Sequence, residues 1–251
     1  MGKQKMVEEA REDKPYLVSK DLGVDYRFWN VFHSNFYTSV IFNNNKSKII
    51  KMKYIDWEEL REKNEPDFNQ AIQACERFGV TDIMAFRYDW NIEVLAQFHA
   101  TYFYNRDTDE IHWMAEGRHY RVDFMTFSHI LGFDEEHHGF SYIHDEQRVV
   151  VREIAFMYLD RRAANGKVKG LKSYYYILNN LIRHTINPKD GAASDQNGYV
   201  RNVLARFALG GDKFNVPRFM WQEIRVAMDD ARKGLPYAPY LMFVIERVTG
   251  Y

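Results

Sequence analysis

The chain has 251 residues, of which 46% are hydrophobic and 16% aromatic, and its formal net charge is −1. This length and composition predict a globular protein whose core is rich in aromatic rings, and they exclude a chain that is disordered throughout. The near-zero charge gives no global attraction to nucleic acid or membranes, and the single cysteine, Cys75, excludes internal disulfides and multi-cysteine metal sites.

The first residues of the chain are charged and offer little to bury. We expect residues 1–22 to form a flexible leader, which is too polar to be a signal peptide. No run of about 18 apolar residues follows, so we expect no membrane contact and an intracellular location, cytoplasmic or nuclear. Residues 23–251 are interpreted as a single mostly helical domain. A division near residues 80–90, after a small N-terminal part, is the alternative.

Helix signals begin at Asp56, which is a suitable N-cap for a helix over residues 57–63. Pro66 favours the start of a second helix, and Gly79 favours its end. Cys75 occupies an apolar position of this helix, which indicates a small buried side chain and not a nucleophile.

The middle of the chain predicts a hairpin between two helices. Apolar residues at helical spacing mark residues 91–103, and two short strands then flank Glu116-Gly117, where glycine supplies a positive φ. We therefore expect a small β-hairpin near residues 109–123. Asp123 is a suitable N-cap for the short helix that follows, and Gly132 closes it.

The second half is predicted to be nearly all helix. Apolar periodicity marks five segments, at residues 150–158, 171–182, 200–209, 220–231 and 241–248. The fold class is therefore mainly α, a multi-helix globular domain with a small β-hairpin. The sequence stops at Tyr251 directly after the last helix, with no polar tail, and we expect the natural protein to continue.

A resemblance to a known family rests on the hairpin and the helix after it. Its residues are Ile111-His112-Trp113, Gly117, Tyr120-Arg121-Val122-Asp123-Phe124, Phe127 and Ile130-Leu131-Gly132-Phe133. This pattern resembles a domain of plant retrotransposon and putative transposon proteins, including those of gypsy-class elements. The helix at residues 89–100 and the Gly-Leu-Pro turn at residues 234–239 extend the resemblance to roughly residues 80–251. Phe133-Asp134 departs from the more common Leu-Pro. The family brings no established catalytic residues, so the resemblance implies kinship without an activity.

Histidines and acids are the residues that could supply catalysis or bind a metal. Six of the nine histidines lie between His112 and His144, but their spacing is not that of zinc ligands, and we interpret them as solvated or hydrogen-bonded. A transposase or nuclease needs three acids that converge on metal ions, whereas pairs such as Asp229-Asp230 fit a helix surface. We expect no catalytic residues, no metal, no cofactor and no small-molecule substrate.

Charge is distributed unevenly along the chain. Residues 107–146 hold ten acids and two bases, whereas residues 148–189 hold nine bases and two acids. Five of these bases surround Asn165-Gly166, a predicted turn, and three tyrosines follow at residues 174–176. The five candidate contacts with nucleic acid or another polyanion are Arg161, Arg162, Lys167, Lys169 and Lys172. The alternatives are charge pairing with the acidic segment, within or between molecules, and plain solvation.

Three functions compete. The first is a non-catalytic structural or interaction domain of a plant retroelement, which could self-associate as capsid-type proteins do. The second is a nucleic-acid-binding accessory domain that uses residues 161–172. The third is a metal-dependent transposase or nuclease, which is disfavoured because no acid lies in the middle of a hydrophobic strand.

Overall fold

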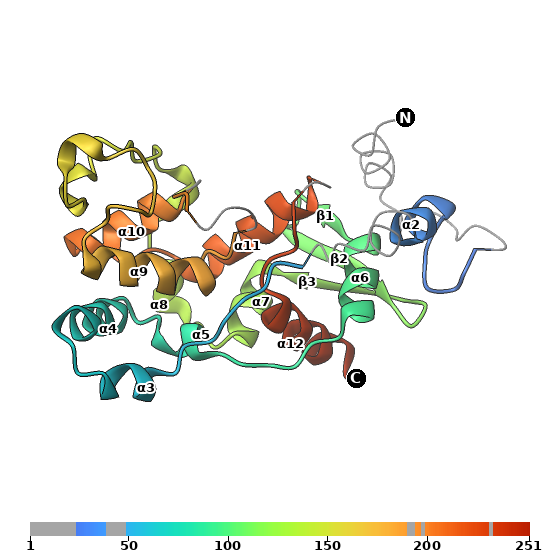
Figure 1. Ribbon diagram of the computed structural model, residues 1–251. Coiled ribbons are helices and arrows are strands. Elements are labelled where there is room, and N and C mark those ends of the chain that lie inside the picture. Colours follow the sequence, from blue (N-terminus) through green and yellow to red (C-terminus); the bar gives the residue numbers. More distant parts are fainter. Residues whose placement is uncertain (1–23, 39–48, 190–193, 197–198, 231–232) are drawn as a thin grey trace. The chain divides into compact units, whose positions relative to one another are not determined.

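The computed structural model describes residues 24–38, 49–189, 194–196, 199–230 and 233–251, and the predicted leader lies outside them. Helices predominate and are accompanied by a three-stranded antiparallel sheet, so the mainly α prediction is confirmed (Figure 1). In the described part of the chain, no helix combines the length and the apolarity needed to cross a membrane.

The chain packs into two compact units, each assembled from separate stretches of sequence. Of the described residues, unit 1 comprises those up to Ile50, those of Tyr88–Asp134 and those of Trp221–Tyr251, and unit 2 comprises those of Lys51–Arg87 and Glu135–Met220. The two units interleave along the sequence.

Unit 1 is built around the sheet, whose strand order is β1-β2-β3. Helix α6 packs on β2, and α12 contacts α6, α7 and β3. The elements are α2 (Val31–Phe36), α6 (Ile92–Thr101), β1 (Phe103–Asn105), β2 (Glu110–Ala115), β3 (Arg118–Asp123), α7 (Phe124–Ile130), α12 (Ala238–Thr249), and the part of α11 (Val216–Met228) from Trp221 onward.

The predicted hairpin is confirmed as β2 and β3, and Glu116-Gly117 forms its turn. Both turn residues have positive φ, 49° for Glu116 and 71° for Gly117, as a two-residue type I′ turn requires. A Cβ on Gly117 would lie 3.2 Å from the Tyr26 ring, so this position has neither the backbone freedom nor the space for a side chain. The sequence pattern predicted the positive φ at glycine alone.

We expect Glu116→Asn to stabilise the protein by about 0.5–1 kcal/mol, because Asn tolerates the left-handed conformation better than Glu does. Urea denaturation measures the difference. As the control, Glu58→Asn replaces an exposed glutamate in helix α3, where the backbone is ordinary α-helix. This substitution should give no gain in stability. A neutral or destabilising effect at Glu116 would contradict the strain that we assign to this turn.

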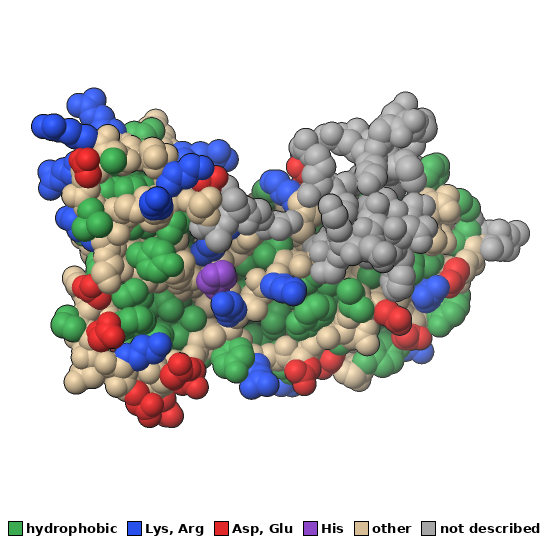
Figure 2. Space-filling view, in the orientation of Figure 1, with side chains coloured by type: hydrophobic (Ala, Val, Ile, Leu, Met, Phe, Trp, Pro, Cys, Tyr) green, Lys and Arg blue, Asp and Glu red, His purple; other side chains and the backbone are tan. Residues whose placement is uncertain are grey.

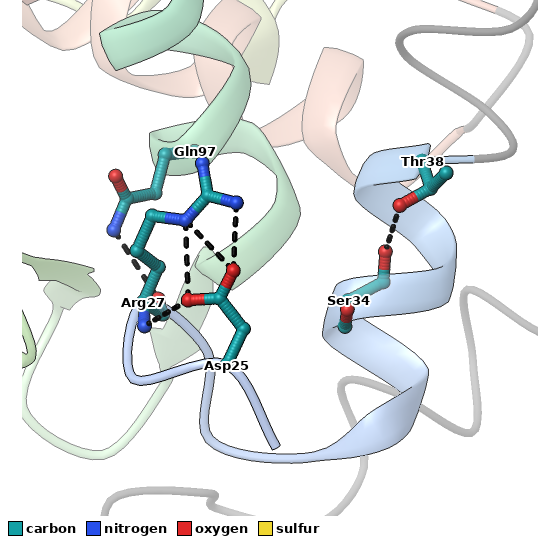
Figure 3. Close-up of polar contacts among 5 residues, drawn as sticks. All are labelled: Asp25, Arg27, Ser34, Thr38 and Gln97. Carbon is teal, nitrogen blue, oxygen red and sulfur yellow. Dashed lines mark hydrogen bonds and ion pairs between the residues drawn. The ribbon is translucent and has the colours of Figure 1, made fainter.

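The N-terminal described segment, residues 24–38, is tied to α6 and to itself by side-chain hydrogen bonds (Figure 3). The Arg27 guanidinium donates to both carboxylate oxygens of Asp25, at 2.7–3.2 Å. Gln97 on α6 donates to the Arg27 carbonyl at 3.2 Å, and the Thr38 hydroxyl donates to the Ser34 carbonyl at 2.9 Å. Beneath these contacts lies a buried cluster of Phe28, Phe36, Tyr37, Ala96 and Ala100.

The core of unit 1 is aromatic, as the composition predicted. Trp113 on β2 and Trp221 on α11 are both buried. The Trp221 ring packs against Phe127 with a centroid distance of 5.0 Å, and its Nε1–H donates to Asp109 Oδ1 at 3.0 Å. Asp109 also accepts from the Tyr104 hydroxyl at 2.6 Å, so the β1–β2 turn is fastened to α11.

Unit 2 is helical. Helices α4, α9 and α10 pack against one another, and α3 packs on α4 (Figure 1). The elements are α3 (Trp57–Glu62), α4 (Pro66–Phe78), α5 (Thr81–Ala85), α8 (Glu135–His138), the 3₁₀ turns η3 (Ile143–Asp145), η4 (Ala155–Met157) and η5 (Arg161–Ala163), α9 (Ser173–His184), α10 (Val200–Leu209), and the start of α11 up to Met220.

Several helix ends of unit 2 follow the sequence signals. The Asp56 side chain accepts from the Glu59 amide at the start of α3, and Gly79 and Gly210 end α4 and α10 in the left-handed conformation. Cys75 is fully buried, as predicted, and burial raises the pKa of its thiol to about 12. This thiol therefore carries no thiolate chemistry near neutral pH.

The helix predicted over residues 150–158 is wrong. The structure has turns and the short 3₁₀ helix η4 there, and Tyr158 is extended, with φ −94° and ψ 148°. The buried residues Met157 and Tyr158 follow the buried Ile154 by three and four positions, a spacing that successive 3₁₀ turns also produce. The backbone leaves the helical path because Tyr158 pairs with Leu171 in an antiparallel bridge.

Candidate polyanion interface

The candidate contact residues lie on one loop of unit 2, residues 158–172, which we call the basic loop. Two backbone hydrogen bonds join the two ends of the loop, from the Leu159 amide to the Gly170 carbonyl and from the Lys172 amide to the Met157 carbonyl, both 2.9 Å. An antiparallel β-bridge between Tyr158 and Leu171 lies at the same place and also holds the two ends together. The predicted turn at Asn165-Gly166 is confirmed, and Gly166 has a φ of 76°.

The far side of the basic loop is fastened to residues 194–196. The Val168 amide donates to the Ser194 carbonyl at 2.7 Å, and the Gln196 amide donates to the Gly166 carbonyl at 2.9 Å. Between these bonds the Lys167 ammonium pairs with the Asp195 carboxylate, which lowers the pKa of Asp195 through the hydrogen bond from Lys167. Lys167 thus has an acidic partner within its own unit.

Hydrogen bonds of buried polar groups connect the loop to residues 195–196 and, through them, to α9. The Tyr158 hydroxyl lies 3.0 Å from both the Lys167 carbonyl and Gln196 Oε1, either of which can accept its proton. Gln196 is buried and donates to Asn179 of α9 at 3.4 Å, and Arg183 of α9 donates to the Asp195 carbonyl at 2.9 Å. Burial raises the pKa of Tyr158, so this hydroxyl keeps its proton. The basic loop is therefore held in a defined conformation.

All five predicted bases are exposed. Arg161 and Arg162 lie in η5, where the Asp160 side chain accepts from the Arg162 amide at 2.8 Å, and Lys172 is the N-cap of α9. Apart from Lys167, none of the five forms an ion pair with another residue that the structure describes. Figure 2 shows Lys and Arg side chains gathered at the upper left, over the yellow part of the ribbon in Figure 1, which includes this loop.

The three tyrosines after the loop divide into two kinds. Tyr174 and Tyr175 are half-buried, with ring centroids 4.9 Å apart, and Tyr175 packs edge-on against Phe156. Tyr176 is 48% exposed. Leu159 is 77% exposed, because its cross-strand neighbour Gly170 has no side chain against which it could pack. Sequence reasoning did not single out Leu159, since an isolated leucine carries no local signal of exposure.

Acids of the sequence stretch 107–146 form ion pairs with bases outside the basic loop. In unit 2, Glu146 pairs with Arg206 of α10. In unit 1, Glu110 pairs with Arg121 of the neighbouring strand, with a distance of 3.2 Å between Glu110 Oε1 and Arg121 Nη1. For these two acids, the uneven charge along the sequence does not translate into pairing with the basic loop.

Unit 1 contains a histidine pair that the sequence did not predict as a pair. His112 Nδ1 lies 2.8 Å from His119 Nε2, and Glu110 Oε2 lies 3.3 Å from His112 Nε2. Burial lowers the pKa of His112 to about 4, and the neighbouring His119 adds to the effect; partial desolvation lowers the pKa of His119, although this residue is exposed. The strand register could have revealed the pair, because it places both side chains on one face.

Metal binding has no geometric support in the described parts of the chain, where no three His, Cys, Asp or Glu side chains converge as metal ligands would. No protein-family model matches the sequence, and neither a curated protein nor a solved structure gives a significant match. The resemblance to plant retrotransposon domains therefore stays a prediction.

Proposed function

We propose that this chain is a non-catalytic interaction domain that binds nucleic acid through the phosphate backbone, with the basic loop as its contact surface. The observation that carries the proposal is the set of four exposed bases, Arg161, Arg162, Lys169 and Lys172, which have no ion-pair partner among the described residues. In the retroelement context that the sequence resemblance suggests, the natural ligand would be the RNA or DNA of the element.

The arrangement of the loop favours the interpretation that its bases bind a ligand over the alternative that they are only solvated. A flexible run of bases loses conformational entropy when it binds, whereas this loop is already fixed by the Tyr158–Leu171 bridge and by Gln196. The loop holds five bases and one acid, Asp160, so its local field is positive although the net charge of the chain is near zero. Phosphate groups are the natural partners of such a field.

The test is a binding titration with labelled single-stranded and duplex oligonucleotides, followed by fluorescence anisotropy at several salt concentrations. We expect the affinity to fall with salt, with a log–log slope of up to about −3 for a single strand if four bases contact phosphates. Replacing Arg161, Arg162, Lys169 and Lys172 together with Gln should weaken binding at least tenfold at about 0.1 M salt and flatten the slope.

A charge-matched control replaces four other bases of unit 2 with Gln. Lys51, Lys53, Lys63 and Arg87 are exposed, lie outside the basic loop and have no ion-pair partner among the described residues. This variant should keep the affinity and the salt slope of the wild type. Equal weakening by both quadruple variants would reduce the proposal to a general charge effect, and failure of the wild type to bind either oligonucleotide would overturn it.

A further inference from the structure

We infer that the surface around the basic loop selects single-stranded over double-stranded nucleic acid, with Tyr176 as the side chain on which an unpaired base stacks. This inference rests on the proposed function and specifies the class of ligand. It follows from the placement of one exposed aromatic ring one helical turn from Lys172, a base of the loop that has no ion-pair partner among the described residues.

Tyr176 lies one helical turn after Lys172, at the start of α9. Its amide donates to the carbonyl of Lys172, the N-cap residue of α9, at 3.0 Å, so the two residues are joined across the first turn of the helix. Both side chains are exposed, so a basic side chain and a phenol ring lie within one helical turn of each other on the surface of unit 2. Tyr174 and Tyr175 are not equivalent candidates, because each is packed against another ring.

A cationic side chain close to an exposed ring is suited to bind a single strand, whose phosphates and nucleobases are both accessible. Lys172 can neutralise a phosphate while the adjacent ring stacks on a nucleobase, and stacking does not depend on which nucleobase is present. Along a duplex the faces of the nucleobases are covered by their neighbours, so a ring on this surface has nothing to stack on. Leu159, 77% exposed on the same loop, offers an apolar contact that unstacked nucleobases can use and a duplex backbone cannot.

The experiment compares single strands and duplexes of equal length, about 12 nucleotides, with the full chain. We expect Tyr176→Ala to weaken single-strand binding about fivefold to tenfold, to leave duplex binding unchanged, and to leave the salt slope unchanged because no phosphate contact is lost. Tyr176→Phe keeps the ring and should restore the affinity. Tyr54→Ala is the matched control, since Tyr54 is 49% exposed in the same unit.

The outcomes separate this inference from the function on which it rests. If the wild type binds both ligands equally and Tyr176→Ala changes neither affinity, the single-strand inference is overturned while nucleic-acid binding stands. If the wild type binds neither ligand, both fail. Binding to vesicles rich in phosphatidylserine, lost in Leu159→Ala and without any binding of nucleic acid, would also overturn both and assign the surface to a membrane.

Discussion

Trp221→Ala is expected to destabilise the protein by about 3–5 kcal/mol. Trp221 is completely buried, packs against Phe124 and Phe127, and donates a hydrogen bond to Asp109. The substitution leaves a cavity among these rings and removes one donor from a carboxylate. Trp221→Phe should cost less, because the ring contacts largely remain and only the indole donor is lost.

Urea denaturation of both variants, followed by circular dichroism, gives the change in the free energy of unfolding. Trp90→Ala is the matched control, because Trp90 belongs to the same unit and is 41% exposed. This control should lose no more than about 1 kcal/mol. If Trp221→Ala costs no more than Trp90→Ala, then α11 does not hold the β1–β2 turn in the way described.

Acidification is expected to weaken the fold between about pH 6.5 and pH 4, through the histidine pair. Burial lowers the pKa of His112 to about 4, and burial also lowers that of His119, so the unfolded chain takes up protons before the folded chain does. The free energy of unfolding is therefore fully retained above about pH 6.5 and falls as the pH drops, by on the order of 2 kcal/mol. Glu110, which faces the pair, opposes this lowering of the pKa values, whereas Arg121 adds to it.

The measurement is a series of urea titrations from about pH 7.5 to about pH 4.5, with the double variant His112→Gln, His119→Gln beside the wild type. Burial also lowers the pKa of His184, which contributes a similar trend in both proteins, so the difference between the two curves isolates the pair. Parallel curves for wild type and double variant would show that protonation of this pair is not coupled to folding.

Local features of the fold were predictable because their causes lie within a few residues. The Asp123 side chain accepts from the Thr126 amide at 2.7 Å, Asp56 caps α3 in the same way, and Gly79 ends α4 with a positive φ. Each depends on one side chain or one backbone conformation next to the helix end. The turn at Glu116-Gly117 is likewise a local feature that the sequence predicted. The positive φ of Glu116 was not predicted, because glutamate is not a residue that favours this conformation.

The sequence by itself determined that this protein is mainly helical, where its hairpin turns, and which five bases cluster around Asn165-Gly166. Only the tertiary structure decided that residues 150–158 are not a helix, because Tyr158 forms a β-bridge with Leu171. It also decided which bases keep their charge unpaired, because Lys167 meets Asp195 from a segment 28 residues away. Hydrogen bonds and φ preferences within one helical turn are properties of a short stretch of chain. Burial and ion pairing depend on segments that folding brings together, and no pattern within a single stretch specifies them.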